Sequence, residues 1–515
     1  MPKQHGAIAA GHPLTAEAAQ HSLEAGGNAV DALIAALFTA CVCEPVLASL
    51  GGGGFALVQT ADTKAEVFDF FTQTPQQKKV AAEADFYAAT VDFGSATQDF
   101  HIGTGAAATP GMLRGLFDLH ARHGSLPMQE LTAFATQQAK QGVRLCAYQA
   151  YILSLVEPIF LATPAARALY ASETQADQVK QAGAILRNPD FADTLEVLST
   201  EGARLFYEGE IAQAIAQQCA SGGHLTQHDL QDYRCILRQP LAFNYQGWSI
   251  LSNPPPSAGG SLIALALQLL HAVDGQLGEF GSARYVEQLI AVMRATQEAR
   301  LAHTSAQGNP DFARLSDPSL IDYYQQAVLQ HSRAYRGTTH VSIMDAQGNA
   351  AAATVSNGEG CGHIIPHTGI MLNNMLGEED LNPLGFFRWA CNERLSSMMA
   401  PTLSRHSNGD LIALGSGGSN RIRSAILQVL INLLHFELPL DVAIQAPRLH
   451  FEQDITYIEG GFSASALHSL QQTHTAYRQW QDLNMFFGGV HTVARRQGKL
   501  QGMGDPRRGG VAYVI

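Results

Sequence analysis

The stretch Gly337-Thr338-Thr339-His340-Val341-Ser342 opens a predicted β-hairpin. Residues 345–349 have the composition of a turn, and residues 350–356 form a second run compatible with a strand. If the turn is centred on its middle residue, Thr338 lies opposite Ser356. Residues that face each other across a hairpin have Cβ atoms about 4.5–5.5 Å apart, so the two hydroxyls are predicted to lie within hydrogen-bonding reach.

This pair of hydroxyls allows two interpretations. A threonine that follows a glycine and faces a second hydroxyl is a plausible activated nucleophile. Two strand hydroxyls that pair for purely structural reasons explain the same pattern. The hairpin by itself does not separate the two.

The part of the chain before the hairpin is predicted to be mainly helical, and the part from the hairpin onward to be rich in strands. Thr15 and Asn28 are predicted helix caps, and Gly51–Gly54 predicts a tight turn with close backbone approach before a strand. Further helices are expected at Gly111–His123, Met128–Gln141, Leu262–Val273 and Ala283–Leu301, and further strands at Trp248–Leu251, Val490–Arg496 and Gly509–Ile515. Residues 325–337 are predicted to form an exposed connector. Helices followed by strands without a Pro/Gly linker favour one layered α+β domain.

The composition excludes several classes of function. The 515 residues carry 32 Lys+Arg against 45 Asp+Glu, a net charge of −13, which argues against nucleic acid or an anionic membrane surface as a partner. The longest apolar stretch, Ala32–Cys43, is shorter than the roughly 20 residues that span a bilayer. A secretory signal is not visible, so a cytoplasmic location is expected. Zinc, nucleotide and calcium motifs are absent, so neither a metal nor a cofactor is predicted.

The hairpin and many blocks along the chain resemble the γ-glutamyltransferase (γ-glutamyltranspeptidase) family of N-terminal-nucleophile hydrolases. The hairpin contributes Gly337–Ser342, Gly348-Asn349 and Thr354-x-Ser356-Asn357. The other blocks are His12-Pro13-Leu14, Gly26–Ala32, Glu44-Pro45, Gly51–Phe55, Thr109-Pro110-Gly111, Leu372-Asn373-Asn374, Arg394–Met398, Gly415–Gly418 and Asp505-Pro506-Arg507.

The resemblance implies a four-layer αββα sandwich and a self-processing enzyme. Thr338 would attack the carbonyl of Gly337, and hydrolysis of the resulting ester would cut the chain into residues 1–337 (large subunit) and 338–515 (small subunit). The freed amino group of Thr338, with an ordinary pKa near ~7.7, would then serve as general base for its own hydroxyl. Small-molecule γ-glutamyl amides such as glutathione, with water or an amine as acceptor, are the implied reactants, and no cofactor is implied. The two products would remain together as a heterodimer.

The resemblance also implies roles for individual residues. Ser356, in place of the usual Thr, would hydrogen-bond the nucleophile. The backbone N–H groups of Gly417 and Gly418, or of Gly418 and Ser419 after a one-residue shift, would form the oxyanion hole. The remaining implied residues bind substrate: Ser396 and Ser397 hold the α-carboxylate, Asn357 contacts the substrate, and Glu378 holds the α-ammonium.

Two features depart from the family pattern. Phe71 stands where family members have an arginine that clamps the α-carboxylate, and it cannot make that charge-assisted contact. The segment between Leu376 and Arg394 is short where many bacterial members have a long lid loop, which predicts a more open site. A related amidohydrolase or acylase with a different acyl group, and an uncleaved relative that only binds a ligand, therefore remain alternative hypotheses.

Overall fold

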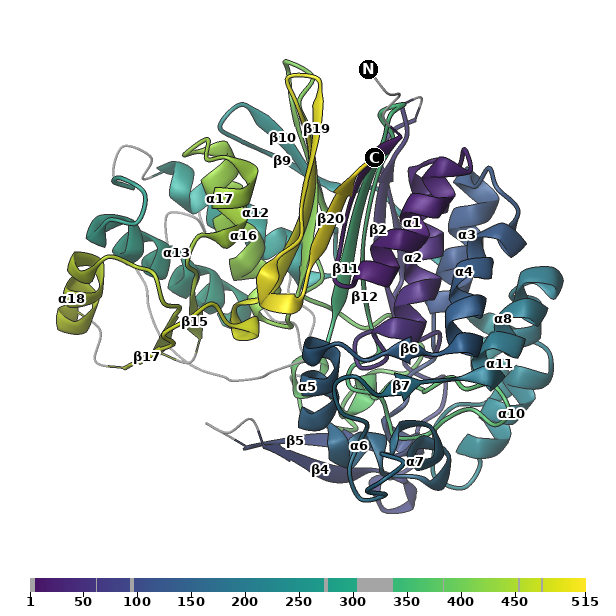
Figure 1. Ribbon diagram of the computed structural model, residues 1–515. Coiled ribbons are helices and arrows are strands. Elements are labelled where there is room, and N and C mark those ends of the chain that lie inside the picture. Colours follow the sequence, from purple (N-terminus) through teal and green to yellow (C-terminus); the bar gives the residue numbers. More distant parts are fainter. Residues whose placement is uncertain are drawn as a thin grey trace.

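The computed structural model describes residues 5–61, 63–92, 97–272, 277–302, 337–382, 384–452, 454–473 and 476–515. The chain has mixed α/β structure with two large sheets, each antiparallel throughout (Figure 1). The first sheet contains, in spatial order, β20 (Val511–Val514), β1 (Gly6–Ala10), β11 (Thr339–Asp345), β12 (Ala350–Ser356), β2 (Gly53–Gln59), β3 (Glu66–Phe70) and β8 (Ile236–Arg238). The second contains β19 (Lys499–Met503), β18 (Gly489–Arg496), β14 (Leu411–Gly417), β13 (Thr402–His406), β10 (Trp248–Ser252) and β9 (Leu241–Tyr245).

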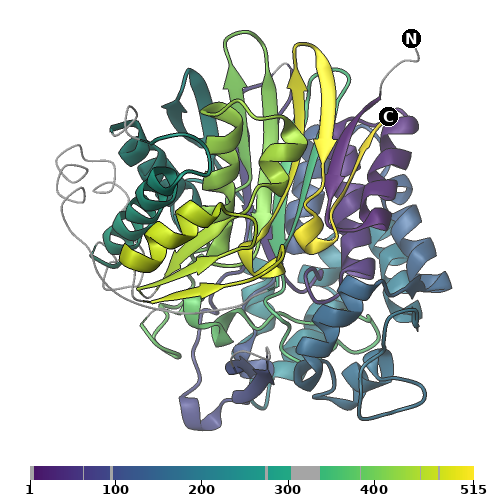
Figure 2. The same cartoon turned by 60° about the vertical axis from the view of Figure 1, so that its left-hand side comes forward.

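The two large sheets pack against each other through β1, β11 and β12 on one side and β14 and β18 on the other. Helices α1 (Pro13–Glu24), α2 (Ala29–Cys43) and α3 (Met112–His123) contact the first sheet. Helices α12 (Ala258–Ala272) and α16 (Arg421–Leu434) contact the second. Figure 2 shows the strands between these two groups of helices.

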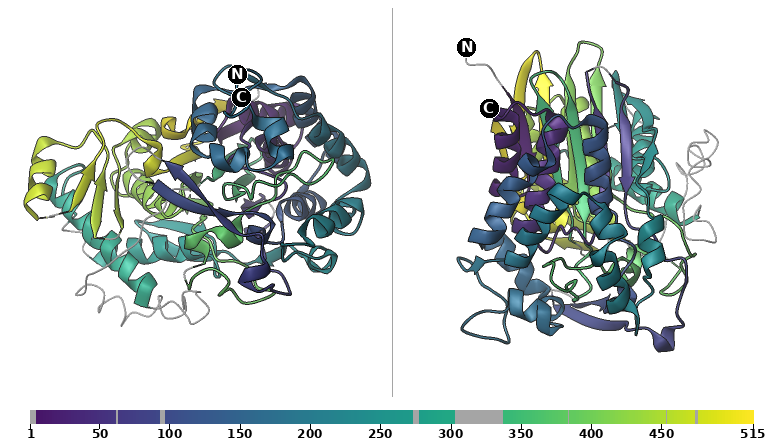
Figure 3. Two further views of the ribbon diagram at one scale, coloured as in Figure 1. Left: turned by 90° about the horizontal axis from the view of Figure 1, so that it is seen from below. Right: turned by 90° about the vertical axis from the view of Figure 1, so that its right-hand side faces the viewer.

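The remaining elements surround this centre. Within the described ranges, the other α-helices are α4 (Met128–Gln141), α5 (Ala147–Leu155), α6 (Glu157–Phe160), α7 (Pro164–Tyr170), α8 (Pro189–Glu201), α9 (Arg204–Tyr207), α10 (Glu210–Cys219), α11 (Gln227–Asp232), α13 (Ala283–Ala302), α17 (Leu440–Gln445) and α18 (Ala464–Thr473). The small sheets pair β4 (Tyr87–Asp92) with β5 (Thr97–Ile102), β6 (Val143–Arg144) with β7 (Ile185–Leu186), and β15 (Leu449–Glu452) with β16 (Ile455–Ile458) and β17 (Tyr477–Gln479). The β4–β5 hairpin crosses the underside of the molecule (Figure 3). In the described ranges, the helices are all too short or too polar to cross a bilayer.

Strand alternation explains why the central hairpin is buried on both faces. On β11, Val341 and Ile343 belong to the core under α2, whereas His340 and Ser342 lie between the sheets, where His340 packs against Gly415. An added Cβ on Gly415 would lie 2.2 Å from His340 Cε1, so a glycine is needed for the two sheets to approach here. Thr338 and Ser356 belong to the same alternating set as His340 and therefore face the second sheet.

Several sequence predictions are confirmed. Helix α4 has the predicted bounds, and Asn28 caps α2 with its side chain. The close approach predicted at Gly51–Gly54 is present, because a Cβ on Gly52 would lie 2.3 Å from Ser356 O.

Other predictions are wrong. Helix α1 begins at Pro13 and is capped by His12, whose Nδ1 accepts from Leu14 N at 3.1 Å, because the Thr15 hydroxyl is instead bound to Glu44 at 2.7 Å. Strand β19 was not expected, and it separates the two predicted C-terminal strands, which join different sheets. Of the predicted connector, residues 325–336 lie outside the described residues, and Gly337 is buried rather than exposed.

Candidate active site

The predicted hairpin register is confirmed, and it brings two hydroxyls onto one peptide carbonyl. Thr339 pairs with Val355, so the ladder, continued by one residue, sets Thr338 opposite Ser356. The Thr338 hydroxyl donates to Gly337 O at 2.8 Å, and the Ser356 hydroxyl donates to the same oxygen at 2.6 Å. Two hydrogen-bond donors therefore polarise the carbonyl of the peptide bond that joins Gly337 to Thr338.

The backbone N–H of Gly337 is bound by a residue that the sequence analysis did not identify. Gly337 N donates to the carboxylate of Glu359 at 2.8 Å, and Glu359 is only 2% exposed. Glu359 follows Ser356 by three residues in a glycine-rich loop. In the sequence, nothing distinguishes its carboxylate from that of an ordinary solvated glutamate.

A second buried carboxylate supports the next residue of the strand. Thr339 Oγ1 donates to Glu44 Oε2 at 2.7 Å, and Glu44 lies at the C-terminal end of α2. Burial raises the pKa of Glu44, and the hydroxyls of Thr15 and Thr339 partly oppose that shift. Glu44 belongs to one of the blocks that resemble the family, but the sequence indicated no role for it.

The glycines predicted to form an oxyanion hole lie beside Thr338. An added Cβ on Gly417 would lie 2.1 Å from Thr338 O, and Gly418 has a φ of +119°, which glycine adopts readily. Neither glycine lines the cavity described below, whereas Ser419 does. The Gly418-Ser419 alternative therefore also fits the geometry, and the oxyanion role stays a prediction.

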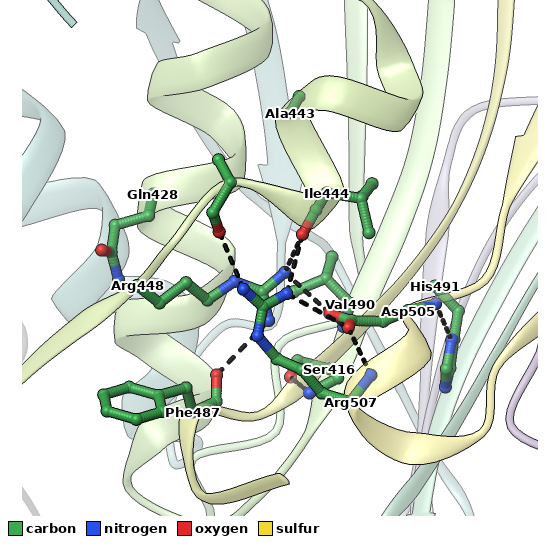
Figure 4. A network of polar contacts seen from close by, with 12 residues as sticks. Ser416, Gln428, Ala443, Ile444, Arg448, Phe487, Val490, His491, Asp505 and Arg507 are labelled. Carbon is green, nitrogen blue, oxygen red and sulfur yellow. Dashed lines mark hydrogen bonds and ion pairs between the residues drawn. The ribbon is translucent and has the colours of Figure 1, made fainter. Parts of the chain in front are cut away.

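Figure 4 shows a buried charged network around Asp505, drawn with Ser416, the residue before Gly417. Asp505 forms ion pairs with Arg448 (2.7 Å) and Arg507 (3.3 Å) and accepts from Val490 N at 2.8 Å. Burial alone would raise the pKa of Asp505, but the two guanidinium groups hold that pKa below its usual value. The network anchors β18 beside β14, at whose end the glycines lie.

A cavity of about 510 Å³ opens onto the hairpin. Six of the predicted site residues line it: Gly337, Thr338, Ser356, Glu378, Ser396 and Ser397. Asn357 does not reach the cavity wall and is buried beside it.

The two serines predicted to hold a carboxylate are already engaged with the backbone. The Ser396 hydroxyl donates to Pro256 O at 2.7 Å, and the Ser397 hydroxyl accepts from Met399 N at 3.1 Å. The Ser397 hydroxyl therefore keeps a proton that it can donate to a ligand, whereas Ser396 must first give up its present partner.

Phe71, which stands where the resembled family has a carboxylate-binding arginine, lines the cavity, and its ring stacks on Phe55 with ring centroids 5.4 Å apart. The structure places a different positive charge, that of Arg394, beside Phe71, and Arg394 also lines the cavity. Its guanidinium donates to Phe71 O, Tyr233 OH and Arg234 O, and lies 3.7 Å from Asp69. Arg394 is thus bound to the protein itself through several contacts.

The short segment between Leu376 and Arg394 forms part of the cavity wall. Phe386 packs against His101 (4.2 Å between ring centroids) and Phe86 (5.2 Å). The ammonium of Lys78 lies 4.2 Å from the centre of the Trp389 ring. These contacts hold the segment against other parts of the chain. Its cavity-lining residues are both aromatic (Phe386, Trp389) and charged (Glu378, Asp380 and Glu393 among them).

The comparisons with known proteins agree on the family. The family model for gamma-glutamyltranspeptidase matches residues 15–515. The chain is 30% identical over 536 residues to the acylase ACY 1 proenzyme of Pseudomonas sp. (strain V22), covering 99% of this chain and 93% of the relative. It is also 30% identical over 547 residues to a glutathione hydrolase proenzyme of Pseudomonas aeruginosa, covering 99% and 94%. The solved structure of cephalosporin acylase from Bacillus halodurans has the same fold, with a TM-score of 0.81 at 23% identity and coverage of 99% and 96%.

Proposed function

The chain belongs to the gamma-glutamyltranspeptidase family of N-terminal-nucleophile hydrolases, and on that premise we propose that it is a self-cleaving amide hydrolase or acyltransferase. Cleavage between Gly337 and Thr338 would give residues 1–337 and 338–515, which stay together because β11 and β12 pair with β1 and β2. The proposal includes a four-layer αββα arrangement. Its main support is the pair of hydroxyls that donate to Gly337 O at 2.8 and 2.6 Å.

The proposed self-cleavage would use this geometry. Thr338 Oγ1 bonds to the carbonyl carbon of Gly337 while the bond from that carbon to Thr338 N breaks, and the hydroxyl proton passes to the departing nitrogen. Water then hydrolyses the ester, which restores the Thr338 hydroxyl and leaves a carboxylate on Gly337. Ser356 would donate to the oxygen on which negative charge develops.

The mature enzyme would use the same hydroxyl on small molecules. The freed amino group of Thr338 takes the proton of its own hydroxyl as Oγ1 attacks the substrate amide. The backbone N–H groups of Gly417 and Gly418, or of Gly418 and Ser419, would stabilise the tetrahedral intermediate. Water or an amine then removes the acyl group from Thr338.

We propose γ-glutamyl amides, glutathione among them, as the first substrate class. Glu378, on the cavity wall, is the candidate partner of an α-ammonium group, and Ser397 the candidate partner of an α-carboxylate. The name of the Pseudomonas aeruginosa relative, glutathione hydrolase proenzyme, supports the same class.

A second substrate class is favoured by one observation at position 71. Phe71 lies on the cavity wall and supplies no charge there, and the contacts of Arg394 with Phe71 O, Tyr233 and Asp69 occupy the neighbouring cation. An acyl group without a carboxylate would fit this wall. The name of the Pseudomonas sp. relative, an acylase, is consistent with this alternative.

Denaturing gels and intact mass measurements on the purified chain test the proposal. The wild type should give two chains that correspond to residues 1–337 and 338–515, and Thr338→Ala should stay whole and inactive. Cleavage of Thr338→Ala at the same bond would mean that another group is the nucleophile. An intact, inactive wild type would favour a relative that only binds a ligand. Rates on γ-glutamyl-p-nitroanilide and on simple acyl p-nitroanilides then separate the two substrate classes.

A further inference from the structure

Gly337, the residue before the proposed cleavage site, is held by hydrogen bonds at both its N–H and its carbonyl group. Its carbonyl accepts from Thr338 and Ser356, and its N–H donates to Glu359 Oε1 at 2.8 Å. Glycine samples a wider range of φ and ψ than any other residue, so its backbone needs external partners to stay in one conformation. Hydrogen bonds at both the N–H and the carbonyl restrict both torsions.

Glu359 is itself immobilised. It is 2% exposed, and its own N–H donates to Asn374 Oδ1 at 3.0 Å. The next turn of the loop is closed by a hydrogen bond from Gly360 N to Asn357 O at 3.1 Å. The carboxylate therefore projects from a fixed loop and can hold the N–H of Gly337 at a defined place.

Glu359 and the main cavity lie on different sides of Gly337. Gly337 lines both the main cavity and a small one of about 40 Å³, and Glu359 lines only the small one. Thr338 and Ser356 line the main cavity and not the small one. Glu359 can therefore hold Gly337 in place without occupying the space where substrate would bind.

We propose that Glu359 is a positioning residue for self-cleavage. By holding Gly337 N–H, it sets the orientation of the Gly337 carbonyl toward the Thr338 hydroxyl. Reactions of this kind depend steeply on alignment, because the reacting atoms must lie close together and in the correct direction. This inference rests on the proposed function, since it concerns the same bond.

The test follows the cleavage of full-length chain made by cell-free translation, sampled over time on denaturing gels. Glu359→Ala removes the acceptor and should slow cleavage about 10- to 100-fold, as expected for a hydrogen bond to a charged group. Glu359→Gln keeps a neutral acceptor for the same N–H and should therefore cleave clearly faster than Glu359→Ala. Asp229→Ala is the matched control: this buried carboxylate also accepts backbone N–H bonds, from Gln76 and Thr226, but does not line the cavity, so cleavage should keep the wild-type rate.

Two results would overturn the inference. One is cleavage of Glu359→Ala at the wild-type rate. The other is equal slowing in the Ala and Gln variants together with an equal drop in melting temperature, which would indicate a merely structural role. The proposed function fails separately: in that case the wild type stays whole, or Thr338→Ala is cut.

Discussion

Replacement of Ser356 by alanine tests how the fold activates its own peptide bond. The Ser356 hydroxyl donates to Gly337 O at 2.6 Å, accepts from Gly358 N at 3.0 Å, and is almost fully buried. The substitution removes one of the two hydroxyl donors on the carbonyl and leaves Thr338 in place.

The expected effect on the cleavage rate depends on whether this hydrogen bond is equally strong in the ground state and the transition state or becomes stronger in the transition state. A hydrogen bond between neutral groups contributes about 0.5–1.5 kcal/mol, which corresponds to a rate change of about 2- to 12-fold. A donor to an oxygen that becomes an oxyanion contributes about 10²–10³ in rate. Because Gly337 O gains negative charge as Thr338 attacks, we expect the larger effect on self-cleavage.

The assay compares cleavage half-times of full-length wild type, Ser356→Ala and Ser356→Thr. Threonine keeps the hydroxyl, so Ser356→Thr should cleave much faster than Ser356→Ala. A folded Ser356→Ala chain that cleaves within about threefold of wild type would refute the oxyanion argument and would be compatible only with the weaker, ground-state hydrogen bond. Equal slowing of both variants would show that packing, rather than the hydroxyl, is responsible.

Three further predictions follow from the geometry. Phe71→Arg should raise kcat/KM for γ-glutamyl-p-nitroanilide relative to an uncharged acyl anilide by about 10- to 100-fold, since it supplies a charge-assisted contact; an unchanged ratio would contradict the assigned position of the carboxylate. Gly415→Ala should lower the free energy of unfolding by at least about 1–3 kcal/mol in urea titrations, because its Cβ would lie 2.2 Å from His340 Cε1; wild-type stability would mean that the sheets separate easily. Burial lowers the pKa of His491 and of His450 to about 4, so the unfolded chain binds protons below about pH 6.5 that the folded chain excludes. The free energy of unfolding should therefore fall by about 3 kcal/mol per histidine between pH 7 and pH 4, a loss that urea titrations at the two pH values would reveal and that His491→Gln should reduce.

The hairpin at the centre of the molecule could be predicted from the sequence because its determinants are local. A short turn joins two strands, so the register follows once the centre of the turn is known, and Thr338 and Ser356 are paired by that register alone. The same holds for α4 and for the Asn28 cap, where neighbouring residues supply the pattern.

The family resemblance added predictions about the reaction and about the residues that take part in it. It pointed to the Gly337–Thr338 bond and to six residues that do line one cavity. It did not reveal that the Ser396 hydroxyl is engaged with Pro256, or that Gly417 and Gly418 lie off the cavity wall. These details depend on hydrogen bonds to distant backbone atoms and on the exact path of the loops. The residue types alone do not determine either.

Only the tertiary structure decided which charged groups act together. Arg394 is bound by Tyr233 and Asp69, which are more than 150 residues away in the chain, and Glu44 reaches Thr339 from the end of α2. Glu359 is near the hairpin in sequence, yet its contact with Gly337 requires a loop folded back by Asn374. Local sequence thus determined the hairpin and its hydroxyl pair, whereas the partners of the buried charges were decided by long-range packing, because a carboxylate or guanidinium is stable in the interior only where distant segments supply its hydrogen bonds.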